Sequence, residues 1–227
     1  MYTRPENADS AFKWEDLMLK NNSELLANLG NFVNRALKFT KDNFEGIIGK
    51  MSLTVEDKQI IAKINRCLKQ YIDLLEKCRE REAITQILNI SRIGNQFMQA
   101  EKPWKLIKNE ESKNRAHSVV SFCANISCLL AILVEPYMPH LSREMFRMLN
   151  IQLEEVNVLG EEEPLFRCFL KPGHVIGKPE PLIKEIKPEE INILKQKFAG
   201  RSSPSKAPEP SQGTNEVNKK KKGNKKR

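Results

Sequence analysis

The stretch N28-L-G-N-F-V-N-R-A-L-K-F39 combines two patterns in one segment. Its leucines, phenylalanines, valine and alanine recur at the spacing of a helix that packs one face against a core. Three asparagines and an arginine stand among them, although asparagine is a poor helix former and is costly to bury without a partner. The segment therefore predicts an amphipathic helix with a polar stripe beside its core face.

Helical patterns continue after this stretch. A capping box at Thr54 and Asp57, a hydroxyl followed three residues later by a carboxylate, marks the start of a second helix. Pro103 ends a third helix, and Pro136 and Pro139 break the chain after a fourth, apolar one. The predicted helices span about residues 15–45, 54–75, 79–100, 112–134, 141–149 and 188–199.

The predicted organisation is all-α: a helical bundle with a partly extended C-terminal appendix and a disordered basic tail. We divide the chain into a lead-in over 1–14, a bundle over 15–149, an irregular appendix over 150–200 that ends in a helix, and a lysine-rich tail over 201–227. Glycines, prolines and short apolar runs fill 150–186, so no strand order is predicted there.

The net charge of +9 is concentrated in the tail. Residues 201–227 hold nine lysines and arginines and two glutamates, a net +7, so the other 200 residues carry only +2. Such a tail can add sequence-independent affinity for RNA by releasing counterions. A nuclear-import signal and a solubilising terminus are the alternatives. The clustered basic residues are Lys219, Lys220, Lys221, Lys222, Lys225, Lys226 and Arg227.

Composition limits the class of protein. With 40% apolar and 30% charged residues, the chain can bury a core and keep a polar exterior. We expect no apolar run of membrane-spanning length and find no apolar signal segment near Met1, which favours a cytoplasmic protein without a membrane partner. The five cysteines form no CxxC pair and there are only three histidines, so we expect reduced core thiols and no metal site.

Two fragments resemble parts of a nucleotide-activating site. K50-M-S52 and H174-V-I-G177 are similar to pieces of the KMSKS and HIGH motifs of class I aminoacyl-tRNA synthetases. Their order is reversed, both are incomplete, and no strand–helix alternation lies between them. There is no glycine-rich phosphate loop, and the acidic run at 161–163 is expected to be solvated. We therefore assign no catalytic residue and no cofactor to this chain.

The polar stripe is the first candidate binding site. At about 100° per residue, Asn28, Asn31 and Arg35 fall within about 60° of one another. Asn34 is expected further round, toward solvent. Amides can donate to and accept from a base edge, and arginine adds a planar fork that stacks or bonds bidentately. The alternative is structural, with Asn28 linking two helices and Arg35 paired with an acid.

The second candidate is E101-K-P-W-K-L-I-K108. It places Trp104 directly after Pro103 and among lysines, a setting that suits stacking of an unpaired base, worth ~1–3 kcal/mol. Packing of Trp104 against the end of the bundle is the alternative. Trp14 is predicted to be a core residue.

With these residues identified, the chain resembles the C-terminal, anticodon-binding portion of methionyl-tRNA synthetases of the eukaryotic cytosolic type. The segment R4-P-E-N-A-D-S-A-F-K-W-E-D16 resembles the junction that leaves their catalytic region. N22-S-E-L-L-A-N-L-G-N-F-V-N-R35 resembles the first helix of their bundle, and G94-N-Q-F-M-Q-A-E-K-P-W-K105 the segment with the anticodon tryptophan. The run LVEPYMP, from Leu133 to Pro139, is similar to the closing turn of class Ia synthetases in general. The resemblance covers about residues 1–200 and implies the anticodon-binding bundle of that class.

The resemblance implies roles for matched residues. Asn31 and Arg35 match residues that read a cytosine at the first anticodon position, and Trp104 matches the residue that stacks on an anticodon base. The implied partner is methionine tRNA with a C-A-U anticodon, whose unstacked loop is read by hydrogen bonding and stacking. Candidates for supporting the site or contacting phosphate are Asn28, Lys105 and Lys108.

The resemblance also implies what this segment lacks. Sites for methionine, ATP and Mg²⁺ belong to a catalytic domain of the same enzyme, which joins methionine to its tRNA, so this chain alone is expected to be inactive. A multi-synthetase complex is a further candidate partner. The alternatives are a stand-alone tRNA-binding protein and a helical scaffold for protein partners.

Overall fold

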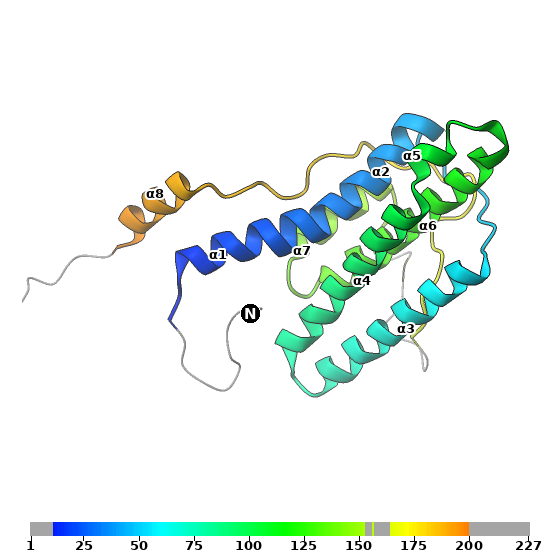
Figure 1. Cartoon of the computed structure of the whole chain (residues 1–227). Coiled ribbons are helices and arrows are strands. Elements are labelled where there is room, and N and C mark those ends of the chain that lie inside the picture. The colour runs from blue at the N-terminus through cyan, green and yellow to red at the C-terminus, as the bar shows by residue number, and fades with distance from the viewer. Residues whose placement is uncertain (1–10, 153–155, 157–163, 200–227) are drawn as a thin grey trace, which may run out of the picture.

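The computed structural model describes residues 11–152, 156 and 164–199, and the structural statements that follow refer to these residues. The predictions for residues 1–10, for the acidic run at 161–163 and for the tail lie outside them. Within the described residues the fold is an all-α bundle without strands, as predicted (Figure 1).

A long helical rod forms the N-terminal part of the fold (Figure 1). It consists of α1 (Trp14–Lys20), a π-helical segment η1 (Asn21–Gly30) and α2 (Asn31–Phe44), which follow one another without a break. The predicted helix over 15–45 is confirmed, but its middle is widened to i→i+5 hydrogen bonding. The Asn31 amide, for example, donates to the carbonyl of Leu26.

Five further helices build the bundle: α3 (Val55–Glu76), α4 (Glu80–Glu101), α5 (Pro103–Leu106), α6 (Glu110–Val134) and α7 (Pro139–Leu149). α3 packs along α4, while α2, α4 and α7 all pack against α6. The capping box is confirmed, because Thr54 Oγ1 accepts from the Asp57 amide and Asp57 Oδ2 accepts from the Thr54 amide. Pro103 and Pro139, expected to stop or break the chain, also begin α5 and α7.

α6 is the central helix, and every residue from Ser118 to Val134 is buried. The expectation that no apolar run reaches membrane-spanning length is wrong, because α6 is long and apolar enough to meet that criterion. The surrounding protein accounts for this composition, since the most apolar window of α6 is 94% buried. A helix that is apolar all round fits the centre of a bundle as well as a bilayer.

α2 and α4 approach each other closely beside this core. Phe32, Val33, Ala36 and Leu37 of α2 are fully buried. A Cβ atom on Gly94 of α4 would lie 2.4 Å from Cζ of Phe32, so a glycine is required where the phenylalanine ring packs on α4. This contact sets the spacing of the two helices that carry the candidate site.

α1 projects beyond the bundle and pairs with α8 (Pro188–Phe198) (Figure 1). The Trp14 ring stacks on Phe198 with centroids 5.9 Å apart, and Lys195 pairs with Glu15. The prediction that Trp14 is a core residue is wrong: it is half-buried, and no residue of α1 is buried. The cause is position, because α1 extends past the bundle, and the ring contacts of Trp14 are with Phe12 and Phe198.

The described part of the appendix is extended and fastened to the bundle at a few points. Asn125 on α6 accepts from the Leu170 amide at 2.9 Å and donates to the Leu170 carbonyl at 3.3 Å. Ile47 and Val175 form an isolated antiparallel bridge, which joins the H174-V-I-G177 segment to the α2–α3 loop containing K50-M-S52. Backbone pairing thus joins the second fragment to residues 46–48 of that loop, and His174 Nε2 lies 2.7 Å from the carbonyl oxygen of Leu149.

All five cysteines are free thiols. Cys123 and Cys128 are buried on α6, where burial raises the pKa of each thiol to about 12. The expectation of core thiols is wrong for Cys78 and Cys168, which are exposed.

Candidate nucleic-acid interface

The exposed face of α2 carries two of the predicted site residues. Asn31 and Arg35 are exposed, one turn apart, while Phe32, Val33 and Ala36 beside them enter the core. Arg35 forms no hydrogen bond or ion pair with any residue that the structure describes. The structural alternative, in which Arg35 pairs with an acid, therefore does not hold for the described residues.

Asn28 does not share that exposed stripe. It is buried, with its Nδ2 donating to the Leu88 carbonyl at 3.1 Å. Its Oδ1 accepts from Asn95 Nδ2 at 3.3 Å, and its carbonyl accepts from Asn95 and from Ser91 Oγ at 3.0 and 3.3 Å. Asn28 thus cross-links η1 to α4, which agrees with a supporting role and leaves it no access to phosphate.

The widened helix explains the difference from the predicted stripe. A π-helix has more residues per turn than an α-helix, so the 100° step does not apply before Gly30. Asn28 consequently faces α4 rather than lining up with Asn31. A second link reinforces this crossing, because Arg92 on α4 bonds Glu24 on η1 with an N–O distance of 2.5 Å.

Trp104 lies in α5 immediately after the third predicted helix, as expected. Lys102 adopts a left-handed conformation (φ 49°) that turns the chain between α4 and α5. The tryptophan is half-buried and packs in part against the core, so the packing alternative holds for one side of the ring. Lys105 and Lys108 are exposed beside it.

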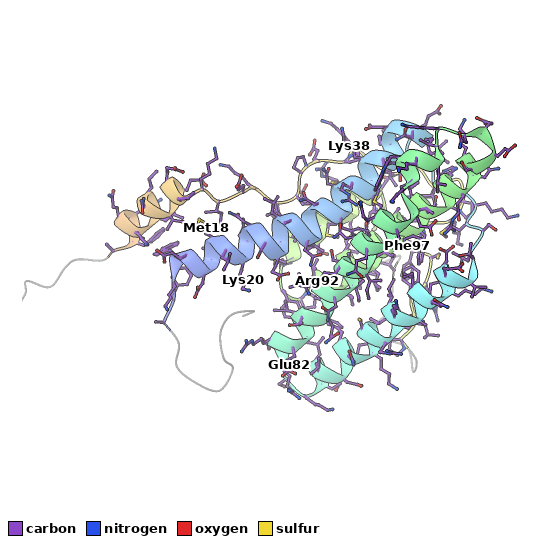
Figure 2. The ribbon with its side chains drawn as sticks, viewed as in Figure 1. Met18, Lys20, Lys38, Glu82, Arg92 and Phe97 are labelled. Carbon is purple, nitrogen blue, oxygen red and sulfur yellow. The ribbon has the colours of Figure 1, made fainter. Side chains whose placement is uncertain are left out.

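Arg35 and Trp104 line one hollow of about 390 Å³, although they come from α2 and α5. We call it the tryptophan hollow. Lys38 stands at its edge on α2 (Figure 2) and pairs with Asp42 at 3.6 Å. Asn34, expected toward solvent, is partly exposed and lines this hollow together with Trp104 of α5. The complete lining is Asn34, Arg35, Lys38, Phe39, Asp42, Asn43, Met98 and Trp104.

A second hollow of about 660 Å³ adjoins Arg35 on the side of α4. We call it the amide hollow, and its α4 residues are not among the predicted site residues. Asn95, Gln99 and Lys102 recur at i, i+4 and i+7, a pattern visible in the sequence that looks like an ordinary solvent face until α2 is placed beside α4. The complete lining is Arg35, Asn95, Gln96, Gln99, Ala100 and Lys102.

An ion-pair cluster holds the end of α4 in place behind these hollows. Arg115 on α6 bonds both carboxylate oxygens of Asp57 at 2.5 and 2.8 Å, and its Nε donates to Glu101 at 3.0 Å. Burial works to raise the pKa of Asp57, but the hydrogen bonds from Arg115 and from the Thr54 amide outweigh it and lower the pKa below its ordinary value. Glu101 is the last residue of α4, so this cluster fixes the point from which α5 and Trp104 depart.

The arrangement can bind an unpaired nucleic-acid strand. It offers an aromatic ring, a free guanidinium, several amides and lysines at its rim, which are the groups that stack on bases, bond their edges and contact phosphate. No group of three or more His, Cys, Asp or Glu side chains in the described part of the chain is arranged to hold a metal ion.

Comparisons with known proteins agree on one family. A family profile described as "Anticodon binding domain of methionyl tRNA ligase" matches residues 49–203, and one described as "tRNA synthetases class I (M)" matches residues 1–37. The "Methionine--tRNA ligase, cytoplasmic" of Xenopus laevis is 46% identical over 201 residues, which are 88% of this chain and 22% of that protein. The Homo sapiens protein of the same name is 43% identical over 211 residues, 91% of this chain and 23% of its own length.

Structure comparison supports the fold. The apo form of Mycobacterium tuberculosis methionyl-tRNA synthetase matches with a TM-score of 0.70 at 19% identity, covering 80% of this chain and 36% of that one. The chain spans about a quarter or less of the length of the two curated relatives above.

Proposed function

The chain belongs to the family of methionyl-tRNA ligase anticodon-binding domains, and from this premise we propose that it recognises the C-A-U anticodon of methionine tRNA. In this proposal Asn31 and Arg35 hydrogen-bond the first anticodon base, a cytosine, and Trp104 stacks on a base of the unpaired loop. Lys105 and Lys108 contact the phosphates beside the tryptophan.

The observation that carries the proposal is the free guanidinium of Arg35 in the tryptophan hollow. Arg92, Arg115 and Arg147 all form ion pairs within the chain. Arg35 forms none with the described residues, yet it lies in one hollow with an aromatic ring held at a helix start. An unpaired guanidinium beside such a ring suits a base that is stacked and hydrogen-bonded at the same time.

We further propose that a catalytic part of the methionyl-tRNA ligase type acts together with this chain. That part would hold methionine, ATP and Mg²⁺ and join methionine to the tRNA that this chain selects, so the chain alone would not aminoacylate. The match of residues 1–37 to the class I profile supports this proposal. The relatives named cytoplasmic support a cytoplasmic location, and a multi-synthetase complex stays a predicted partner.

The test is a binding titration at near-physiological salt with two anticodon stem-loops. One carries C-A-U, and the other carries U at the first anticodon position. We expect about a tenfold or greater preference for C-A-U, because one good base contact is worth ~1–3 kcal/mol. Arg35→Ala should abolish this preference, whereas Arg66→Ala, which removes another exposed positive charge, on α3, should retain it.

Equal binding of the two stem-loops by the unaltered chain would refute the proposal and favour a scaffold for protein partners. Removal of residues 201–227 tests the tail separately. We expect it to weaken binding of both stem-loops alike and to flatten the salt dependence. An unchanged salt dependence would show that the tail takes no part in binding.

A further inference from the structure

The amide hollow has a chemistry of its own. Its α4 wall presents Gln96 and Gln99, both exposed and neither hydrogen-bonded to any residue in the described ranges. Asn95 differs, because its Nδ2 is engaged with Asn28 and with the Ser91 carbonyl. No carboxylate lines this hollow, so nothing in its wall repels a phosphate.

The two hollows are adjacent because they share Arg35. A strand that places one base against Trp104 therefore brings a neighbouring base to the α4 side of the same guanidinium. Lys102, at the turn between α4 and α5, lines the amide hollow and supplies a positive charge for the backbone of that nucleotide. The geometry thus suits two consecutive unpaired nucleotides rather than a single base.

Free glutamine amides favour adenine over guanine. A side-chain amide has a donor and an acceptor in one plane, which matches the paired acceptor and donor of adenine. Guanine instead offers two acceptors on its Hoogsteen edge, which match arginine or lysine. The wall of the hollow contains two unengaged amides, whereas its arginine is shared with the tryptophan hollow.

We propose that the amide hollow holds the middle base of the anticodon, an adenine, and that Gln96 and Gln99 read its edge. This inference rests on the proposed function and adds to it a second base position with its own specificity residues. The first base is then read from α2 and the second from α4.

The experiment measures binding of three stem-loops that share one stem and carry C-A-U, C-G-U or U-A-U. We expect the unaltered chain to prefer C-A-U over C-G-U by about tenfold. The double variant Gln96→Ala/Gln99→Ala should reduce that preference to about twofold or less while keeping the preference for C over U at the first position. Gln70→Ala, which removes an exposed glutamine from α3, should change neither preference.

Two results would overturn the inference alone. One is a double variant that keeps the full preference for adenine, and the other is an unaltered chain that selects C at the first position but binds C-G-U as well as C-A-U. If the unaltered chain does not distinguish C-A-U from U-A-U, the proposed function fails and the inference fails with it. A thermal melt of the double variant checks folding, and Gln99→Met, which keeps a similar side-chain length but removes the amide without adding a charge, tests the same loss a second time.

Discussion

Arg115 and Arg35 both lie against the last turns of α4, but they differ in whether their guanidinium groups have partners inside the protein. The guanidinium of Arg115 forms ion pairs with the carboxylates of Asp57 and Glu101. Arg35 shares a hollow with Gln99 and Lys102 on α4 and has no partner within the described ranges of the chain. A guanidinium that is fully paired stabilises the protein, while one left free is available to a ligand.

Asn28 and Asn31 repeat the contrast three residues apart on the helical rod. Asn28 is buried and has hydrogen-bond partners on both ends of its amide, whereas Asn31 is exposed on the outer face of α2. The lesson is that residue type alone does not separate support from recognition at this site. The separation comes from burial and from whether a partner inside the protein already occupies the polar atoms.

The largest effect on stability should come from breaking the Arg115 cluster. We expect Arg115→Ala to lower the free energy of unfolding by ~2–3 kcal/mol, because it leaves the buried Asp57 carboxylate unpaired; the value lies below the usual range since Arg115 is partly exposed. Arg35→Ala should change it by less than ~0.5 kcal/mol. Urea denaturation measures both, and similar losses for the two variants would contradict the comparison.

A smaller effect should separate the two asparagines. Asn28→Ala removes the donor to the Leu88 carbonyl and one acceptor of Asn95, so we expect a loss of ~1–2 kcal/mol in the free energy of unfolding. Asn31→Ala should leave stability within ~0.5 kcal/mol, because the residue is exposed and alanine is the better helix former. Urea denaturation curves for the two variants measure these changes. An Asn28→Ala protein as stable as the parent would show that the hydrogen bonds of Asn28 make no net contribution to the free energy of unfolding.

Much of the site was accessible from the sequence, for physical reasons. The helical period of α2 placed Asn31 and Arg35 beside the core face, and the capping box fixed the start of α3, because both depend on local spacing. For Asn28 the sequence left two alternatives open, and the structure has the one in which it links two helices, because the widened η1 turns it toward α4. The hollow lined by Gln96 and Gln99 was not predicted, because a polar helix face becomes a hollow only when a second helix lies next to it.

Trp14 shows the same limit of local sequence patterns, here in a residue that was predicted to be buried and is not. The sequence predicts that it is a core residue, but local patterns do not specify that α1 extends past the bundle and pairs with α8. Trp104 was easier to place, because a proline and a left-handed turn residue determine locally where α4 ends and α5 begins. Position relative to distant helices is therefore the part that local patterns leave undetermined.

The smallest expected effect is a pH dependence confined to acid conditions. The pKa of Asp57 is lowered by folding, so its contribution to stability is fully present above the unfolded pKa, about 3.9, and is lost as pH falls through the folded value. The difference in Tm between the parent and Asp57→Asn should therefore be constant near neutral pH and shrink as pH drops below about 4. Asp73→Asn, which changes an exposed carboxylate on α3, serves as the control. If the Tm difference for Asp57→Asn stays constant down to acid pH, the Arg115 cluster does not draw its stability from the ionised carboxylate, and the contrast between a paired and a free arginine loses its electrostatic basis.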